Sequence, residues 1–288
     1  MAAVTPAAAP VAAPSAAPPR RGSTGRRRPW RGLVLVVAAA YFLIPLAASF
    51  WFSVDVPGQG FSLAAYLEIF SADGFTRSLL LSLALATTTI VVVLLITLPA
   101  ALAVRLGAAR LRPVLEVICT LPLIVPPITF VAGISTVLRW GPDHLASTPF
   151  WATLIAIQNP DFPVVLALAY VVLALPFVYR ALDAGLGALD VRTVVEAARN
   201  LGASWPRVMF MVIIPNLRSA LAGASFLTLA LVLGEYTIAR LLGFGPFSVW
   251  IVTISGSDAQ LSVSVSVLSL LLTWALLLVL SSIGRKRT

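Results

Sequence analysis

The sequence predicts an all-α polytopic membrane protein with six membrane-spanning helices. Three observations lead to this fold class: the composition, the length of the apolar runs and the placement of the basic residues. Of the 288 residues, 59% are hydrophobic and only 11% are charged, and the mean hydropathy is +0.99. Because soluble domains carry about a quarter charged residues, this composition is typical of a chain embedded in a bilayer.

Six apolar runs come close to the ~20 residues that a helix needs to cross a bilayer. They are Leu33–Val54, 78–104, 114–138, 162–179, 219–234 and 261–283. The first run follows a basic stretch, as the core of a secretory signal does, but its 22 residues are too many for such a core. We therefore interpret Leu33–Val54 as a retained span.

The basic residues are distributed unevenly between the segments that join these runs. If the N-terminus lies inside, 17 of the 20 lysines and arginines fall on the inner side, and only Arg77, Arg139 and Arg240 fall on the outer side. The positive-inside rule then predicts that both termini and the segment 180–218 are cytoplasmic. The net charge of +9 is explained by these flanking arginines, so we expect no nucleic-acid partner.

The segment Asp190–Pro215 has the polar signals of helix starts and stops in an otherwise apolar chain. Asp190 is a good N-cap, and Gly202 is a good helix stop because glycine enters the left-handed region without steric cost. Ser204 and Pro206 then open a second short helix, which Pro215 ends or kinks. The first helix is amphipathic: its apolar side carries Val191, Val194, Val195, Ala198 and Leu201, and its polar side carries Arg192, Glu196, Arg199 and Asn200.

This segment resembles the Glu-Ala-Ala loop of bacterial binding-protein-dependent ABC importer permeases. The residues that carry the resemblance are Glu196-Ala197-Ala198, Gly202 and Val212-Ile213-Ile214-Pro215. That family usually has Ile and Leu where this chain has Val212 and Ile214, and both departures keep apolar bulk. The proline run at 121–127 and the segment Leu175–Arg180 resemble the same family.

The resemblance implies a type I importer permease (MetI-like) fold in a bacterial plasma (inner) membrane. It implies a cytoplasmic loop that docks into a cleft on an ATPase subunit. In that role Glu196 and Arg199 would anchor polar contacts, Gly202 would fix the turn, and the small residues Ala197 and Ala198 would permit close approach. Pro215 closes the same motif.

The implied partners are an ABC ATPase dimer at the cytoplasmic face, a second permease subunit in a heterodimer, an extracytoplasmic solute-binding protein and the lipid bilayer. The implied domain organisation has four parts. They are a disordered Ala/Pro/Arg-rich tail (1–31), the first span with an external loop (32–77), the permease core (78–283) with its coupling loop 180–218, and a basic tail (284–288).

The sequence predicts no enzyme and no cofactor of its own. The only lysine is Lys286, preceded by Arg285, so a phosphate-binding Gly-Lys-Ser/Thr loop is impossible; if ATP drives this protein, a partner chain binds and hydrolyses it. One cysteine, Cys119, and one histidine, His144, cannot build a zinc site. We predict no catalytic residues and no metal site.

Two features within the apolar runs point to a solute pathway. Pro122, Pro126 and Pro127 break the third run, either as a packing kink or as an element that lines the pathway. Glu235, followed by Tyr236, ends the fifth run. A carboxylate there is either paired with Arg240, satisfied by backbone groups, or in contact with solute.

The solute is the least defined part of the prediction. The resemblance points to permeases of the polyamine, sulfate, molybdate, thiamine and iron group, and a carboxylate in the path suits a cation. We therefore favour a polyamine-like solute (spermidine or putrescine), with an aminophosphonate, an oxyanion, thiamine or iron as the alternatives. A protein of a different class, an ion-coupled secondary transporter, would need more acids within its spans than this chain has.

Overall fold

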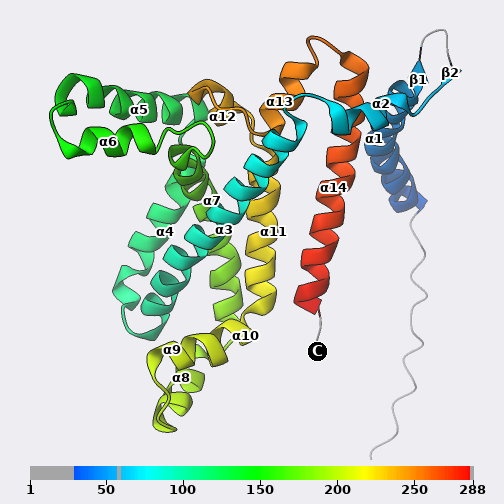
Figure 1. The fold of residues 1–288 in the computed structure, drawn as a ribbon. Coiled ribbons are helices and arrows are strands. Elements are labelled where there is room, and N and C mark those ends of the chain that lie inside the picture. Colours follow the sequence, from blue (N-terminus) through cyan, green and yellow to red (C-terminus); the bar gives the residue numbers. More distant parts are fainter. Residues whose placement is uncertain (1–28, 57–59, 286–288) are drawn as a thin grey trace, which may run out of the picture. The chain divides into compact units, whose positions relative to one another are not determined.

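The computed structural model describes residues 29–56 and 60–285, and these are largely helical (Figure 1). Nearly all of the predicted tail 1–31 and the last three residues of the tail 284–288 lie outside the described residues. The chain separates into two compact units, residues 1–45 and 46–288. The described part of the first unit is the first part of helix α1 (Pro29–Val54), and the other described residues belong to the second.

The described residues contain four helices that are long and apolar enough to cross a membrane. They are α1, α3 (Phe75–Leu106), α7 (Val164–Gly187) and α14 (Ala259–Arg285). Two bent pairs of helical segments, Ala109–Leu123 with Pro127–Leu145 and Trp205–Asn216 with Arg218–Gly234, raise the number to six if each pair is one span. These elements fall on the six apolar runs, so the predicted all-α membrane fold is confirmed.

The other elements are shorter than these four helices. The helical ones are α2 (Ala64–Glu68), η1 (Ile69–Ser71), η2 (Ala109–Leu111), α4 (Arg112–Thr120), η3 (Leu121–Leu123), α5 (Pro127–Trp140), η4 (Gly141–Leu145), α6 (Pro149–Ala156), α8 (Val191–Asn200), α9 (Trp205–Val208), η5 (Met209–Ile213), α10 (Ile214–Asn216), α11 (Arg218–Gly234), α12 (Thr237–Leu242) and α13 (Phe247–Ile254). Two-residue strands β1 (Asp55–Val56) and β2 (Gly60–Phe61) pair antiparallel, with Asp55 opposite Phe61.

Helices α3, α7 and α11 pack together, and α14 packs on α11 (Figure 1). Small residues bring α7 and α11 close: a Cβ built on Gly185 would overlap the side chain of Ala220. Such contacts are typical of helix packing in membranes, where lipid is as apolar as the side chains and close approach supplies the attraction. Many large apolar side chains on these helices are exposed, which fits a surface that faces lipid rather than water.

The interior is divided into three apolar clusters along the bundle. The first joins α3, α7 and α11 to α8 and the segment that follows it. The second joins the same three helices to α5, α12 and α13. The third packs Phe75, Phe247 and Trp250 in aromatic contact near the start of α3. Helix α8 belongs to the first cluster and α13 to the second, and Figure 1 shows that the two helices lie at opposite ends of the bundle.

One predicted boundary, the end of the fourth span, is wrong for a physical reason. Helix α7 continues to Gly187, eight residues beyond the predicted end of the fourth span, because its apolar positions keep helical spacing through Leu182 and Leu186. The third span bends by 99° at residues 124–126, where the sequence predicts that its prolines break the helix. The outer segment 139–161 contains helix α6, and the predicted short helix near 246–252 is present as α13.

Candidate functional site

Helix α8 begins where the sequence predicts. The carboxylate of Asp190 accepts a hydrogen bond from the backbone N–H of Thr193 at 3.4 Å and another from its hydroxyl at 2.7 Å. These contacts satisfy one of the donors that the first turn of a helix leaves without an intrahelical partner. Only three residues separate the end of α7 from the start of α8, so the position of α8 is fixed by the bundle.

The helix ends at Gly202, which has a φ of +82°. The N–H of Gly202 donates to Arg199 O at 2.9 Å and the N–H of Ala203 donates to Ala198 O at 3.1 Å. This is the bonding of a Schellman motif, in which a residue in the left-handed region satisfies the last carbonyls of a helix. Gly202 therefore supplies a conformation that a side chain with a Cβ adopts only with strain.

The apolar side of α8 differs in part from the sequence prediction. Val191 and Val195 are buried within the chain, each 5% exposed, and Ala198 packs on the same cluster. These side chains attach α8 to the bundle and are not available to a partner. Leu201 lies at the end of the helix and away from the buried face, and its side chain is 89% exposed.

The polar side of α8 carries a defined set of contacts. Arg192 Nε donates to Glu196 Oε1 at 2.9 Å across one turn of the helix. Arg199 lies over the ring of Trp205, with 5.5 Å from its guanidinium carbon to the ring centroid, and donates to Ala203 O at 3.1 Å. Together with Leu106, Val195 and Asn200, these residues line an open hollow of about 410 Å³. Ala197 is exposed beside it.

The second short helix follows as predicted, with two differences. Ser204 occupies the N-cap position of α9, with Pro206 in the first turn, but its side chain makes no capping hydrogen bond. Before Pro215 the chain forms a π-helical turn, η5. This wider turn accommodates the loss of a helical hydrogen bond at Pro215, because proline has no backbone N–H to donate. The segment 205–216 then meets α11 at 77°, so Pro215 lies next to the bend that the sequence predicts.

Glu235 follows the last residue of α11 and is half-buried. Its carboxylate accepts hydrogen bonds from the backbone N–H groups of Ile238 (2.7 Å) and Ala239 (3.2 Å), and from the hydroxyl of Tyr170 (3.2 Å). No ion pair joins it to Arg240 among the described residues. Its donors are uncharged, so they orient the carboxylate without neutralising it. Tyr236 is half-buried against the same apolar cluster.

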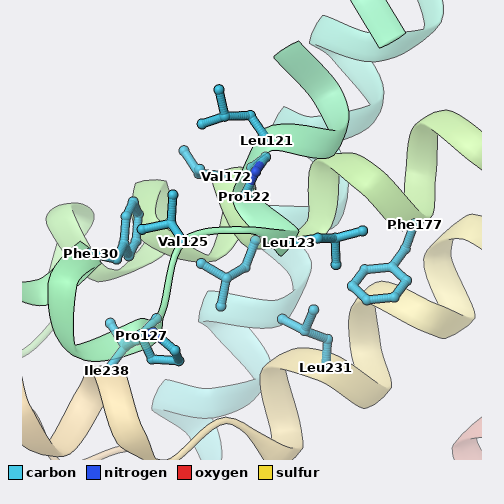
Figure 2. Close-up of a pocket in the computed structure, with 11 residues that line it drawn as sticks. Leu121, Pro122, Leu123, Val125, Pro127, Phe130, Val172, Phe177, Leu231 and Ile238 are labelled. Carbon is cyan, nitrogen blue, oxygen red and sulfur yellow. The ribbon is translucent and has the colours of Figure 1, made fainter. Parts of the chain in front are cut away.

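The break in the third span lies beside a cavity of about 280 Å³ (Figure 2). Pro126 is extended, with ψ at 142°, because a following proline disfavours the helical region; Pro127 then opens α5. All the lining residues are apolar: Leu121, Pro122, Leu123, Val125, Pro127, Phe130, Val172, Leu173, Phe177, Leu231 and Ile238. Pro127 therefore lines the cavity and Pro126 does not.

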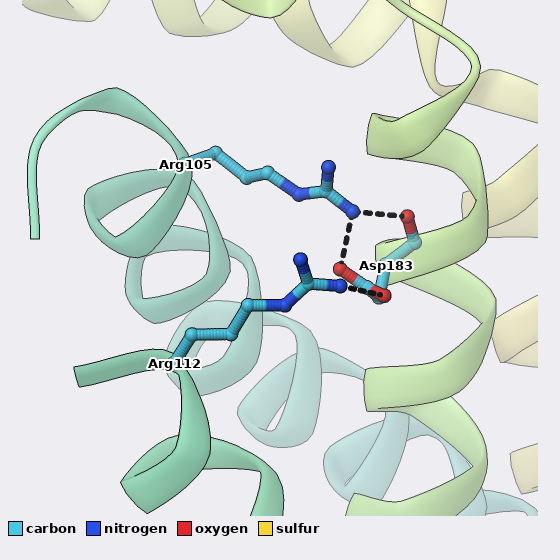
Figure 3. A network of polar contacts seen from close by, with 3 residues as sticks. All are labelled: Arg105, Arg112 and Asp183. Carbon is cyan, nitrogen blue, oxygen red and sulfur yellow. Dashed lines mark hydrogen bonds and ion pairs between the residues drawn. The ribbon is translucent and has the colours of Figure 1, made fainter. Parts of the chain in front are cut away.

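Sequence reasoning missed one polar cluster, which joins α3, α4 and α7 (Figure 3). Arg105 at the end of α3 donates to Asp183 of α7 through the carboxylate Oδ1 (2.5 Å) and the backbone oxygen (3.1 Å). Arg112 at the start of α4 donates to Asp183 Oδ2 at 3.4 Å. The signal for it was the helical spacing that continues past Tyr179, which places Asp183 on α7 and not in a loop.

The fold and these sites define a polytopic helical membrane protein with a capped amphipathic helix at one end of its bundle. Comparison with known proteins is more specific. A family model described as "binding-protein-dependent transport system inner membrane component" matches residues 94–286, which is well over half of the chain. The chain belongs to this family.

Three similar proteins agree with the assignment. A probable molybdenum ABC transporter permease protein of Haloferax volcanii is 27% identical over 249 residues, covering 82% of this chain and 84% of the relative. The putrescine transport system permease protein PotI of Escherichia coli is 25% identical and covers 76% of both chains. The molybdenum transport system permease protein ModB of Mycobacterium tuberculosis is 26% identical, covering 89% of this chain and 94% of the relative.

These matches support the role of a membrane-embedded ABC importer permease, and favour it over the ion-coupled secondary transporter that the sequence left as an alternative. A permease of this family is a transport subunit. The relatives carry different cargoes by name, so they leave the solute of this chain open.

Proposed function

We propose that this chain forms the solute pathway of an ABC importer and that α8 couples it to a separate ATPase subunit. The observation that carries the proposal is the division of α8 into two faces. Val191 and Val195 attach the helix to its own bundle, while Glu196, Ala197 and Leu201 are exposed. A helix held on one side and open on the other is suited to transmit the movement of a partner to the bundle.

The exposed side offers both kinds of contact that a docking surface needs. Leu201 is an apolar anchor, and anchors that become fully buried dominate interface energies. Glu196 and Arg199 border the hollow of about 410 Å³, where a partner side chain would fit. Gly202 fixes the end of the helix, and Ala198 packs behind it. ATP is bound and hydrolysed by the partner, and this chain contributes no cofactor.

The orientation in the membrane follows from charge. We assign α8 and both termini to the cytoplasm, because the basic residues gather in the segments on that side. A cysteine scan tests this directly, since the chain has a single cysteine, Cys119, which is buried. In a Cys119→Ser background, an impermeant thiol reagent should label Leu241→Cys in intact cells and Leu201→Cys only in inverted vesicles. Labelling of Leu201→Cys from outside would overturn the proposal.

The same cysteine tests the coupling role. Leu201→Cys should form a crosslink with a co-expressed ATPase subunit, whereas Leu241→Cys, also exposed but on α12, should not. A Leu201→Cys variant that crosslinks only to lipid or to other copies of the chain would count against docking. We further propose a heterodimer with a second permease subunit, and a solute-binding protein that docks at the end of the bundle opposite α8.

For the solute, we propose a polyamine-like cation. The carboxylate of Glu235 is held by uncharged donors, so its charge is available to a cation, and PotI belongs to a putrescine system. A second candidate is an oxyanion, because two of the relatives belong to molybdenum systems and cover more of the chain. Uptake by the reconstituted importer with its binding protein separates the two: radiolabelled putrescine should enter, and molybdate should neither enter nor compete.

A further inference from the structure

Asp183 holds together both sides of the turn that joins α3 to α4 (Figure 3). Arg105 precedes this turn and Arg112 follows it, and both donate to the carboxylate of Asp183. The side chains of Arg105 and Asp183 are only 28% and 30% exposed, and that of Arg112 is 51% exposed. Two positive charges therefore share one negative charge in a partly shielded place.

The carboxylate belongs to the same packed unit as α8. Asp183 lies one turn before the end of α7, and α8 starts shortly after that end. Its neighbours Leu182 and Leu186 are buried in the cluster that also contains Val191 and Val195 of α8. A displacement of α8 must therefore displace the end of α7 that carries Asp183, because packed interiors deform little.

Arg112, the partner of Asp183 in this contact, belongs to the broken third span. Arg112 is the first residue of α4, which continues through η3 to the break at 124–126 and its apolar cavity. Cys119 is the only buried residue of α4. Little of α4 is packed into the interior, and Arg112 attaches its first turn to α7 through Asp183 and also through Tyr179.

We propose that Asp183 is a positioning residue that keeps α4 attached to α7 while α8 moves, so that displacement of α8 reaches the break in the third span. This inference rests on the proposed function of α8. Loss of the carboxylate removes an attraction and also leaves Arg105 and Arg112 as neighbouring like charges, which repel each other. Without Asp183, the start of α4 separates from α3 and α7, and the break no longer follows α8.

The experiment uses the complete importer in proteoliposomes and measures solute uptake per ATP hydrolysed. Asp183→Asn keeps the shape of the side chain and removes its charge, and Asp183→Glu restores the charge. The matched control is Arg180→Gln, because Arg180 lies on the same helix end, is exposed and has no ion-pair partner among the described residues. We expect Asp183→Asn to lower uptake per ATP about fivefold, Asp183→Glu to recover most of it, and Arg180→Gln to match the wild type.

A spectroscopic readout separates positioning from general damage. Spin labels at Val117 on α4 and Phe177 on α7, in the Cys119→Ser background, report the distance between the two helices. In Asp183→Asn this distance should broaden and increase, while in Asp183→Glu and Arg180→Gln it should remain as in the wild type. Wild-type distances and uptake in Asp183→Asn, or equal loss in Asp183→Asn and Asp183→Glu, would overturn the inference.

The two proposals fail in different ways. If the wild-type chain neither captures an ATPase subunit nor shows ATP-dependent uptake, the proposed function fails, and this inference with it. If the wild type couples normally and Asp183→Asn couples equally well, only the role of Asp183 is lost.

Discussion

Helices α8 and α12 begin in similar ways and end in the same way, at opposite ends of the bundle (Figure 1). Asp190, the N-cap of α8, accepts from the backbone N–H of Thr193, and Glu235, one residue before the N-cap of α12, accepts from those of Ile238 and Ala239. Each ends at a glycine with positive φ, +82° at Gly202 and +84° at Gly243. The bonding beyond that glycine is also the same, because Phe244 N–H donates to Ala239 O as Ala203 N–H donates to Ala198 O.

The surroundings of the two helices differ. Ile238 and Ala239 of α12 are fully buried, and Ile238 lines the apolar cavity. Most of α8 is exposed, with Val191 and Val195 as its buried attachments. The comparison teaches that caps and stops determine where a short helix lies, and that the rest of its surface determines what it does. The α12 helix forms part of the interior wall, whereas α8 presents a surface to a partner.

The largest difference between the two helices is expected in coupling to the ATPase when the glycine that ends each helix is replaced. Valine in the left-handed region is strained by roughly 1–3 kcal/mol, and a Cβ at either Gly202 or Gly243 meets no other atom within 4 Å. Gly202→Val should leave membrane insertion intact and abolish transport-coupled ATP hydrolysis. Gly243→Val carries a similar strain and should still capture the ATPase subunit. Pull-down and ATP hydrolysis by the reconstituted importer measure both.

This prediction would be contradicted by unchanged uptake in Gly202→Val. Equal loss of ATPase capture in both variants would also contradict it, because the effect would then come from strain anywhere in the bundle. Gly202→Asn serves as the rescue variant, since asparagine tolerates the left-handed region better than other residues with a Cβ.

The next largest effect is expected on the unfolding free energy when the acidic side chain at the start of each helix is replaced. Glu235→Ala leaves the backbone donors of the buried residues Ile238 and Ala239, and the Tyr170 hydroxyl, without their acceptor, which costs about 1–3 kcal/mol in unfolding free energy. Asp190→Ala should cost about 1 kcal/mol, because water replaces the carboxylate at an exposed cap. Denaturant unfolding in mixed micelles, followed by circular dichroism, compares the two. A larger loss for Asp190→Ala would mean that α8 is more shielded than its exposed face indicates.

Sequence reasoning located α8 and missed α12, although the two share one design. The start and stop of α8 stand out because Asp190 and Gly202 lie on either side of a ten-residue amphipathic pattern. The six residues of α12 are too few for periodicity and follow an apolar run, so Glu235 was assigned a role without the helix that it caps. The apolar runs predicted the spans because composition and length are local properties.

The polar cluster at Asp183 shows a second limit. Its partners lie 78 and 71 residues away along the chain, and nothing local indicates which arginine meets which carboxylate. The prolines of the third run predicted a break, but the 99° bend depends on how α5 packs against other helices. Tertiary packing, which pattern alone does not contain, decides both.

A smaller effect is expected from the exposed apolar residues of the two helices. Leu201 of α8 is 89% exposed and Leu241 of α12 is 52% exposed, so serine at either position should hardly change the unfolding free energy. Leu201→Ser should weaken the affinity for the ATPase subunit roughly tenfold, as the loss of an interface anchor does, and Leu241→Ser should leave it unchanged. Surface plasmon resonance with the chain in nanodiscs gives both values. A weaker complex with Leu241→Ser alone would place docking at the other end.

The smallest effect is expected from the charged side chains on the two helices. Arg192 and Glu196 pair across one turn of α8, but their side chains are 74% and 62% exposed, and such pairs contribute no more than about 0.5 kcal/mol. Arg240 of α12 is exposed and has no ion-pair partner among the described residues. Arg192→Gln and Arg240→Gln should therefore lower the unfolding free energy equally little in the micelle assay. A loss above about 1 kcal/mol in Arg192→Gln alone would show that the hollow beside Glu196 shields the pair from water, and the exposed side of α8 would then be a more enclosed surface than its side-chain exposure indicates.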